Sequence, residues 1–100
     1  MRTHPLDYEF QSRRMCANTA EELWRYVNEH CPTGSFLEAV ISNDLREACA
    51  QADDRNMWTL PVIVAWLYNE APGSCWGSPA KYEEWVNYRD HDVDNGACDI

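Results

Sequence analysis

A stripe of apolar residues between positions 35 and 52 constrains the fold of this chain more than any other feature. Its members recur every three or four residues, as they do on one face of an α-helix, and are Leu37, Val40, Ile41, Leu45, Ala48, Cys49 and Ala52. The segment Ser35-Phe-Leu-Glu38 matches a capping box, in which a hydroxyl and a carboxylate bind the free amides of a first helical turn. The pattern predicts one amphipathic helix from Ser35 to about Ala52.

A second helix is predicted before this stripe. Thr19-Ala-Glu-Glu22 is another capping box. Pro32 and Gly34 are typical of residues that end a helix. The apolar positions between these signals have helical spacing and are Ala20, Leu23, Trp24 and Val27.

Two more helices are predicted toward the C-terminus. One covers about residues 54–69, where Pro61 either bends the helix or occupies its first turn. Ser78-Pro79 is a favourable N-cap and first-turn pair for the other. No run of alternating apolar and polar residues predicts a strand. We therefore expect an all-α, compact assembly of about four helices.

The last residues differ in composition from the rest. Residues 90–100 hold four acids, one glycine and only two large apolar side chains, Val93 and Ile100, so we expect a disordered acidic tail. One hundred residues suit a single domain. The predicted organisation is a helical domain over residues 1–89 and a tail over residues 90–100.

Negative charge is the strongest compositional signal. Seventeen acids against eight bases give a net charge of −9. Residues 1–20 carry three bases and two acids, so residues 21–100 carry −10. Such a chain should repel nucleic acid and anionic membranes and be attracted to a basic partner. The alternative is that the charge only keeps the protein soluble.

The apolar segments indicate a cytoplasmic protein without a membrane span. The longest apolar run, residues 60–68, is far shorter than the ~20 residues that a membrane helix needs. Residues 1–9 contain no apolar stretch of the signal-peptide type. An odd number of cysteines in such a chain favours reduced thiols over a disulfide framework.

No pattern for catalysis, a metal or a cofactor stands out. Consecutive cysteines are at least 15 positions apart, so no closely spaced pair of zinc ligands exists. Glu29, His30 and Cys31 have the residue types of a nucleophilic site, but consecutive side chains point in different directions. No glycine-rich phosphate loop or His-Glu-x-x-His helix is present. We therefore expect a protein that is not an enzyme.

Two other positions each have a structural and a functional interpretation. Asp44, next to Asn43, lies at the edge of the predicted buried stripe, where a carboxylate needs a partner. It caps a helix or binds a basic group of another protein, and capping is the more common role. Trp76 lies between two predicted helices, where it fills a gap or forms an interface hot spot.

Several segments resemble a family of small uncharacterised helical proteins encoded by bacteriophages and prophages. The resemblance spans about residues 23–86 and carries no reaction with it. Its segments are Leu23–Val27, Cys31–Leu45, Ala52–Asn56, Ile63–Pro72 and Trp76–Ser78, with Trp85 downstream. It implies an accessory protein of a mobile element that acts in the host cell.

Charge, size and this resemblance together favour a binding protein. The expected function is docking on a basic host protein surface, as in an anti-CRISPR-like inhibitor of a host defence nuclease. The alternatives are a self-associating scaffold protein and a protein that sequesters a small molecule. The oligomeric state stays open. The candidate partner-binding residues are Glu21, Glu22, Glu29, Glu38, Asn43, Asp44, Glu47, Asp53, Asp54 and Trp76.

Overall fold

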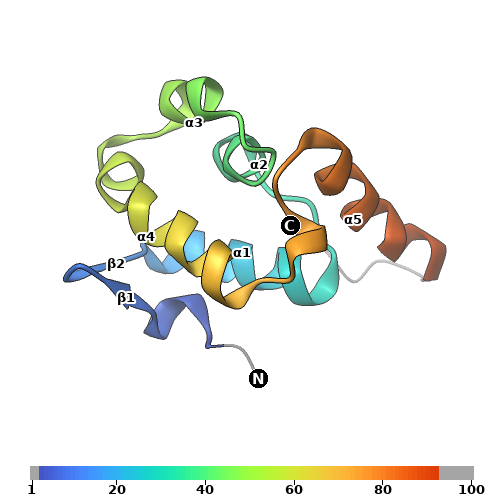
Figure 1. Ribbon diagram of the computed structural model, residues 1–100, viewed down its shortest axis with the longest axis horizontal. Coiled ribbons are helices and arrows are strands. Elements are labelled where there is room, and N and C mark those ends of the chain that lie inside the picture. Colours follow the sequence, from blue (N-terminus) through green and yellow to red (C-terminus); the bar gives the residue numbers. More distant parts are fainter. Residues whose placement is uncertain (1–2, 93–100) are drawn as a thin grey trace.

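The computed structural model describes residues 3–92 and confirms the all-α prediction. Five α-helices are joined by short loops and accompanied by one very small hairpin (Figure 1). In chain order the elements are η1 (Pro5–Asp7), β1 (Glu9–Phe10), β2 (Arg13–Arg14), α1 (Ala17–Glu29), α2 (Ser35–Ile41), α3 (Leu45–Gln51), α4 (Asp54–Glu70), η2 (Gly73–Cys75) and α5 (Pro79–Asp92).

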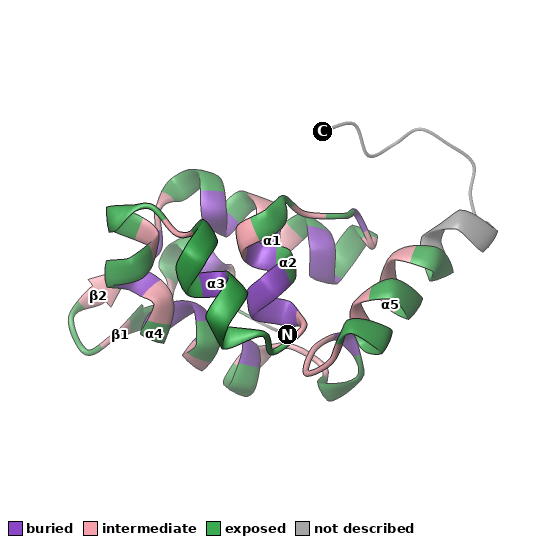
Figure 2. Cartoon of the chain, turned by 90° about the horizontal axis from the view of Figure 1, so that it is seen from above, coloured by how far each residue is buried: buried purple, intermediate pink, exposed green. Residues whose placement is uncertain are grey.

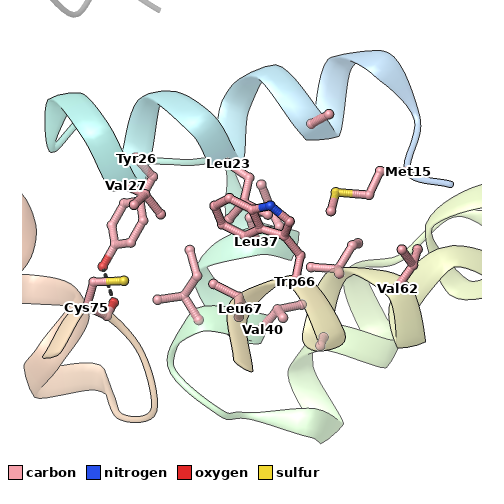
Figure 3. Close-up of a cluster of buried hydrophobic side chains, with 14 of the residues drawn as sticks. Met15, Leu23, Tyr26, Val27, Leu37, Val40, Val62, Trp66, Leu67 and Cys75 are labelled. Atoms are coloured by element: carbon pink, nitrogen blue, oxygen red, sulfur yellow. Dashed lines mark hydrogen bonds between the residues drawn. The ribbon is translucent and has the colours of Figure 1, made fainter. Parts of the chain in front are cut away.

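The core forms where the apolar faces of α1, α2 and α4 meet (Figure 3). Each helix contributes residues three or four positions apart, which share one face. Trp66 of α4 is the largest fully buried side chain and lies among the side chains of the other two helices. Other buried members include Leu23, Tyr26 and Val27 of α1, Leu37, Val40 and Ile41 of α2, and Val62, Ile63 and Leu67 of α4.

The predicted helix from Ser35 to Ala52 is wrong in one respect, because it is broken into α2 and α3. Asn43 adopts a left-handed conformation with φ 65°, and the Asp44 amide donates to the Ala39 carbonyl at 2.8 Å. Asn tolerates this conformation at the end of a helix. Asp44 then caps α3, because its side chain accepts from the Glu47 amide at 3.2 Å. As a result Leu45, predicted on the buried stripe, is 68% exposed.

Both predicted capping boxes are wrong. Helix α1 begins at Ala17, two residues before Thr19, whose buried hydroxyl donates instead to Asn56 Oδ1 at 3.1 Å. Glu22 accepts a hydrogen bond from the Gly34 amide and so links α1 to the start of α2. Ser35 is the first residue of α2 and does not cap it.

The other two predicted helix starts are confirmed. Asp53 caps α4 by accepting from the Asn56 amide at 2.8 Å, and α4 then continues through Pro61 to Glu70. Pro61 therefore lies inside the helix rather than at its first turn. The Ser78 hydroxyl accepts from the Lys81 amide at 3.2 Å, so Ser78 caps α5 as expected.

The hairpin contradicts the expectation of no strands. Glu9 pairs with Arg14 and Phe10 with Arg13 in antiparallel register. The loop residues Gln11 and Ser12 both have positive φ, a geometry for which hairpins usually employ Asn or Gly. The sequence therefore lacks the usual signal for this turn.

The C-terminal part departs from the predicted domain boundary. Helix α5 runs to Asp92, so residues 90–92, assigned to the tail, are helical. The rest of the predicted tail lies outside the described residues. Figure 2 shows α5 beside the α1, α2 and α4 core, with most of its described surface exposed.

The described cysteines are not all alike. Cys16, Cys49 and Cys75 are not disulfide-bonded. Cys31 is disulfide-bonded, so the expectation that every thiol is reduced is wrong for this residue.

Candidate functional site

Three of the predicted site residues meet in one shallow depression on the surface. Glu38 of α2 and Asp44 and Glu47 at the start of α3 line a hollow of about 330 Å³. The remaining lining residues come from α2, α3 and the start of α5 and are Ser35, Ala39, Ser42, Gln51 and Pro79. We call this hollow the acidic depression.

The turn at Asn43 brings these carboxylates together. It folds α3 back against α2, so that the first turns of both helices border one hollow. Glu38 and Glu47 each lie in such a first turn, where the helix dipole stabilises a negative charge. Gln51 Nε2 donates to Glu47 Oε2 at 2.8 Å and fixes that side chain.

The described lining of the acidic depression carries no positive charge. No lysine, arginine or histidine is among its lining residues. The two ion pairs found between residues 3 and 92 join His4 to Glu21 and Arg14 to Glu9, both at 3.5 Å. Glu38 and Glu47 are exposed, so their charges are available to a cation from another molecule.

The other predicted acids do not line this hollow. Glu21 pairs with His4, Glu22 binds the Gly34 amide and Asp53 caps α4. Glu29 and Asp54 are exposed on α1 and α4, and Asn43 is exposed at the turn between α2 and α3.

Trp76 lies in the loop between η2 and α5. Its side chain is half-buried and packs against the core. The amide of the next residue, Gly77, donates to the Ile41 carbonyl of α2 at 2.7 Å. This contact holds the loop before α5 against the core.

Two further surface features were missed in the sequence. A second hollow lies beside α5 and includes His30 and Trp85. An apolar stripe runs along the outer face of α4. The spacing of that stripe is visible in the sequence, but α4 is apolar nearly all round, so the sequence alone did not tell its inner face from its outer one.

Neither a metal site nor a membrane helix is found between residues 3 and 92. No group of three His, Cys, Asp or Glu side chains there is arranged to hold a metal ion. No helix in the same range is long and apolar enough to cross a membrane.

Comparison with known proteins identifies no relative of this chain. No family model matches the chain, no curated protein matches its sequence and no solved structure matches its fold.

Proposed function

We propose that this protein is an accessory binding protein of the phage type that docks its acidic depression on a basic surface of a host protein. It acts in the cytoplasm of the host cell by occupying that surface and not by catalysis. The observation that carries the proposal is the gathering of Glu38, Asp44 and Glu47 in one hollow whose described lining contains no cation.

The physical argument combines short-range and long-range attraction. A concave site partly excludes water, so an arginine or lysine that enters it forms stronger charge-assisted hydrogen bonds than on a flat surface. The net charge of −9 attracts a basic partner over a longer range and speeds association. Carboxylates in this arrangement can take the place of nucleic-acid phosphates in a groove of the partner protein. A defence nuclease, as the target of an anti-CRISPR-like inhibitor, has such a groove.

The test compares two pairs of substitutions with equal charge change. Glu38→Gln with Glu47→Gln removes two of the three negative charges of the acidic depression while keeping side-chain shape. Asp7→Asn with Glu83→Gln removes the same charge from two exposed positions elsewhere. Each protein is used to capture partners from a bacterial host lysate, and bound proteins are identified by mass spectrometry. We expect a basic protein that the first pair loses and the second pair retains.

Two results would contradict this proposal. One is capture of the same proteins by both pairs, since the acidic depression would then be irrelevant. The other is equal loss in both pairs, since only net charge would then matter. Asp44 is left unchanged in these variants because it caps α3.

A second candidate function, self-association, is supported by the outer face of α4. Met57, Pro61, Val64 and Tyr68 lie at the i, i+4, i+7 and i+11 positions of that helix, which form one face. Met57 is 42%, Val64 40% and Tyr68 77% exposed. This apolar face is opposite the buried face that carries Trp66.

The charge distribution favours a second copy of the chain as the occupant of this face. Residues 55–69 contain no acid, so two copies of this negatively charged protein repel each other least there. An antiparallel approach centred between Pro61 and Val64 places Met57 opposite Tyr68 of the other copy. Twofold symmetry of this kind is the commonest in homo-oligomers.

Sedimentation equilibrium tests the second candidate. We expect a reversible dimer that Tyr68→Lys converts to monomer, while Tyr88→Lys, at a 59% exposed tyrosine on α5, leaves the dimer intact. A monomer at all concentrations, or a dimer that survives Tyr68→Lys, would exclude association through α4.

A further inference from the structure

The hollow beside α5 has a volume of about 630 Å³. It lies between the C-terminal end of α1, η2 and the outer half of α5. Its lining residues are His30, Ser74, Glu84, Trp85, Asn87 and Tyr88. Three of the six are aromatic or imidazole rings, so we call this hollow the aromatic pocket.

His30 is held firmly in the aromatic pocket. It ends α1 in a left-handed conformation with φ 58°. Its ring centroid lies 4.2 Å from that of Trp85 and 4.8 Å from that of Tyr88. Its Nδ1 lies 2.8 Å from the Trp85 carbonyl oxygen. Because a carbonyl can only accept, Nδ1 is the donor in this contact, so the tautomer with a single proton has Nε2 as its hydrogen-bond acceptor.

The indole of Trp85 is held in place by a hydrogen bond to α1. Its Nε1 donates to the Tyr26 carbonyl oxygen at 2.7 Å, and the Tyr26 ring stacks on Tyr82 at a centroid distance of 5.3 Å. Trp85 is therefore tied to the core through Tyr26, and its ring does not have to be ordered when a ligand binds. Preorganisation of this kind reduces the entropy cost of binding.

The groups that line the aromatic pocket suit a cation. The faces of aromatic rings carry negative partial charge, Glu84 adds a full negative charge, and Asn87 and Ser74 offer side-chain oxygens. No lysine or arginine is among its described lining residues. A planar guanidinium stacks on aromatic faces and donates to a carboxylate at the same time.

We propose that the aromatic pocket binds an arginine side chain, whose guanidinium stacks on the rings of Trp85 and Tyr88 and donates to Glu84 and to Nε2 of His30. The proposal goes beyond the proposed function, because the aromatic pocket and the acidic depression have no described lining residue in common. A free arginine derivative tests it without the host partner, so either proposal can fail while the other stands.

The test titrates the full-length protein with Nα-acetyl-L-arginine amide and follows the Trp85 indole resonance by NMR. The control ligand is Nα-acetyl-L-citrulline amide, which has nearly the same shape without the charge. We expect saturable binding of the arginine probe with a Kd of about 1–10 mM, as for a single stacked ion pair. The citrulline probe should bind at least about fivefold more weakly.

Three variants locate the binding. Glu84→Gln and Tyr88→Leu should each weaken binding by about threefold or more, and both positions are exposed, so the fold should persist. Glu83→Gln removes the same charge from the adjacent exposed position outside the pocket lining and should leave the Kd unchanged. Equal binding of both probes, no saturation, or equal effects of Glu83→Gln and Glu84→Gln would overturn the proposal.

Discussion

The hydroxyl of Tyr26 donates a 2.7 Å hydrogen bond to the carbonyl oxygen of Cys75 (Figure 3). Both residues are fully buried and lie 49 positions apart in the sequence. The bond joins the last turn of α1 to η2, just before the loop that leads into α5. It therefore connects the core to the element that carries the aromatic pocket.

Tyr26→Phe should lower the free energy of unfolding by about 1–3 kcal/mol, because a hydrogen bond in the core would be lost. Urea denaturation followed by circular dichroism measures the change. Tyr68→Phe, at a 77% exposed tyrosine, serves as the control and should have almost no effect. A loss of stability no greater than in this control would show that the bond contributes little.

The same tyrosine should make the protein less stable in alkali. Burial, and to a smaller extent the neighbouring Cys75 and Tyr82, raise the pKa of Tyr26 far above its usual value. Above pH ~10 the unfolded chain loses this proton while the folded chain keeps it, so stability falls as the pH rises. Between pH 9 and 11 the wild type should lose about 1.4 kcal/mol more than Tyr26→Phe. Equal losses in urea titrations of both proteins would contradict this expectation.

Asp44→Ala should destabilise the protein by about 1 kcal/mol, because the Glu47 amide would lose its cap. Asp44→Ser retains a capping oxygen and should recover most of that loss. Asp54→Ala is the control, since Asp54 is an exposed residue in the first turn of α4 that does not act as its N-cap. Melting temperatures of the four proteins provide the comparison, and equal melting of the Ala and Ser variants would argue against capping.

Pro61→Ala should stabilise the protein by about 1–2 kcal/mol. A proline inside a helix costs about 3 kcal/mol relative to alanine, and about 1 kcal/mol of this is offset because proline restricts the unfolded chain. Pro61 is exposed on α4, so its removal leaves no cavity in the core. The urea midpoint should rise, and a fall would mean that the proline ring makes a contact that alanine cannot replace.

The three described cysteines without a disulfide bond should differ in their reactivity. Cys49 is exposed, Cys16 is half-buried and Cys75 is fully buried, and only an accessible thiol is alkylated rapidly. Iodoacetamide labelling followed by peptide mass mapping should modify Cys49 first and Cys75 only after denaturant is added. Rapid labelling of Cys75 in the native protein would show that the region around η2 opens readily.

The helices were predictable because their buried faces have regular spacing. The helical spacing of apolar residues predicted which face of each helix is buried. The residues predicted on those faces include Leu23, Val27, Ile63 and Leu67, and all four are buried. The break at Asn43 was missed because Leu45 and Cys49 extend the apolar pattern past the turn, although both are exposed. Ser42, Asn43 and Asp44 were the local signal, since such residues favour helix ends over helix interiors.

The sequence predicted three of the residues of the acidic depression as candidates, but it did not predict that they line one hollow. Glu38 and Glu47 are nine positions apart, and on one straight helix they would lie about half a turn from each other. Both residues line one hollow because the chain turns at Asn43 between α2 and α3. The aromatic pocket depends on a contact between His30 and Trp85, which are 55 positions apart, and nothing local in the sequence encodes that contact.

The N-terminal segment is held by both backbone groups of Thr3. Its amide donates to Glu70 Oε1 at 2.9 Å, and its carbonyl accepts from the buried Trp66 indole at 2.7 Å. A label carried by the side chain at position 3 therefore lies at a set position beside the last turns of α4, because both hydrogen bonds use the backbone. Energy-transfer distances measured to a fluorophore on a cysteine substituted for Thr3 would accordingly refer to a fixed point of the fold, which makes this position a suitable anchor for mapping where a partner sits.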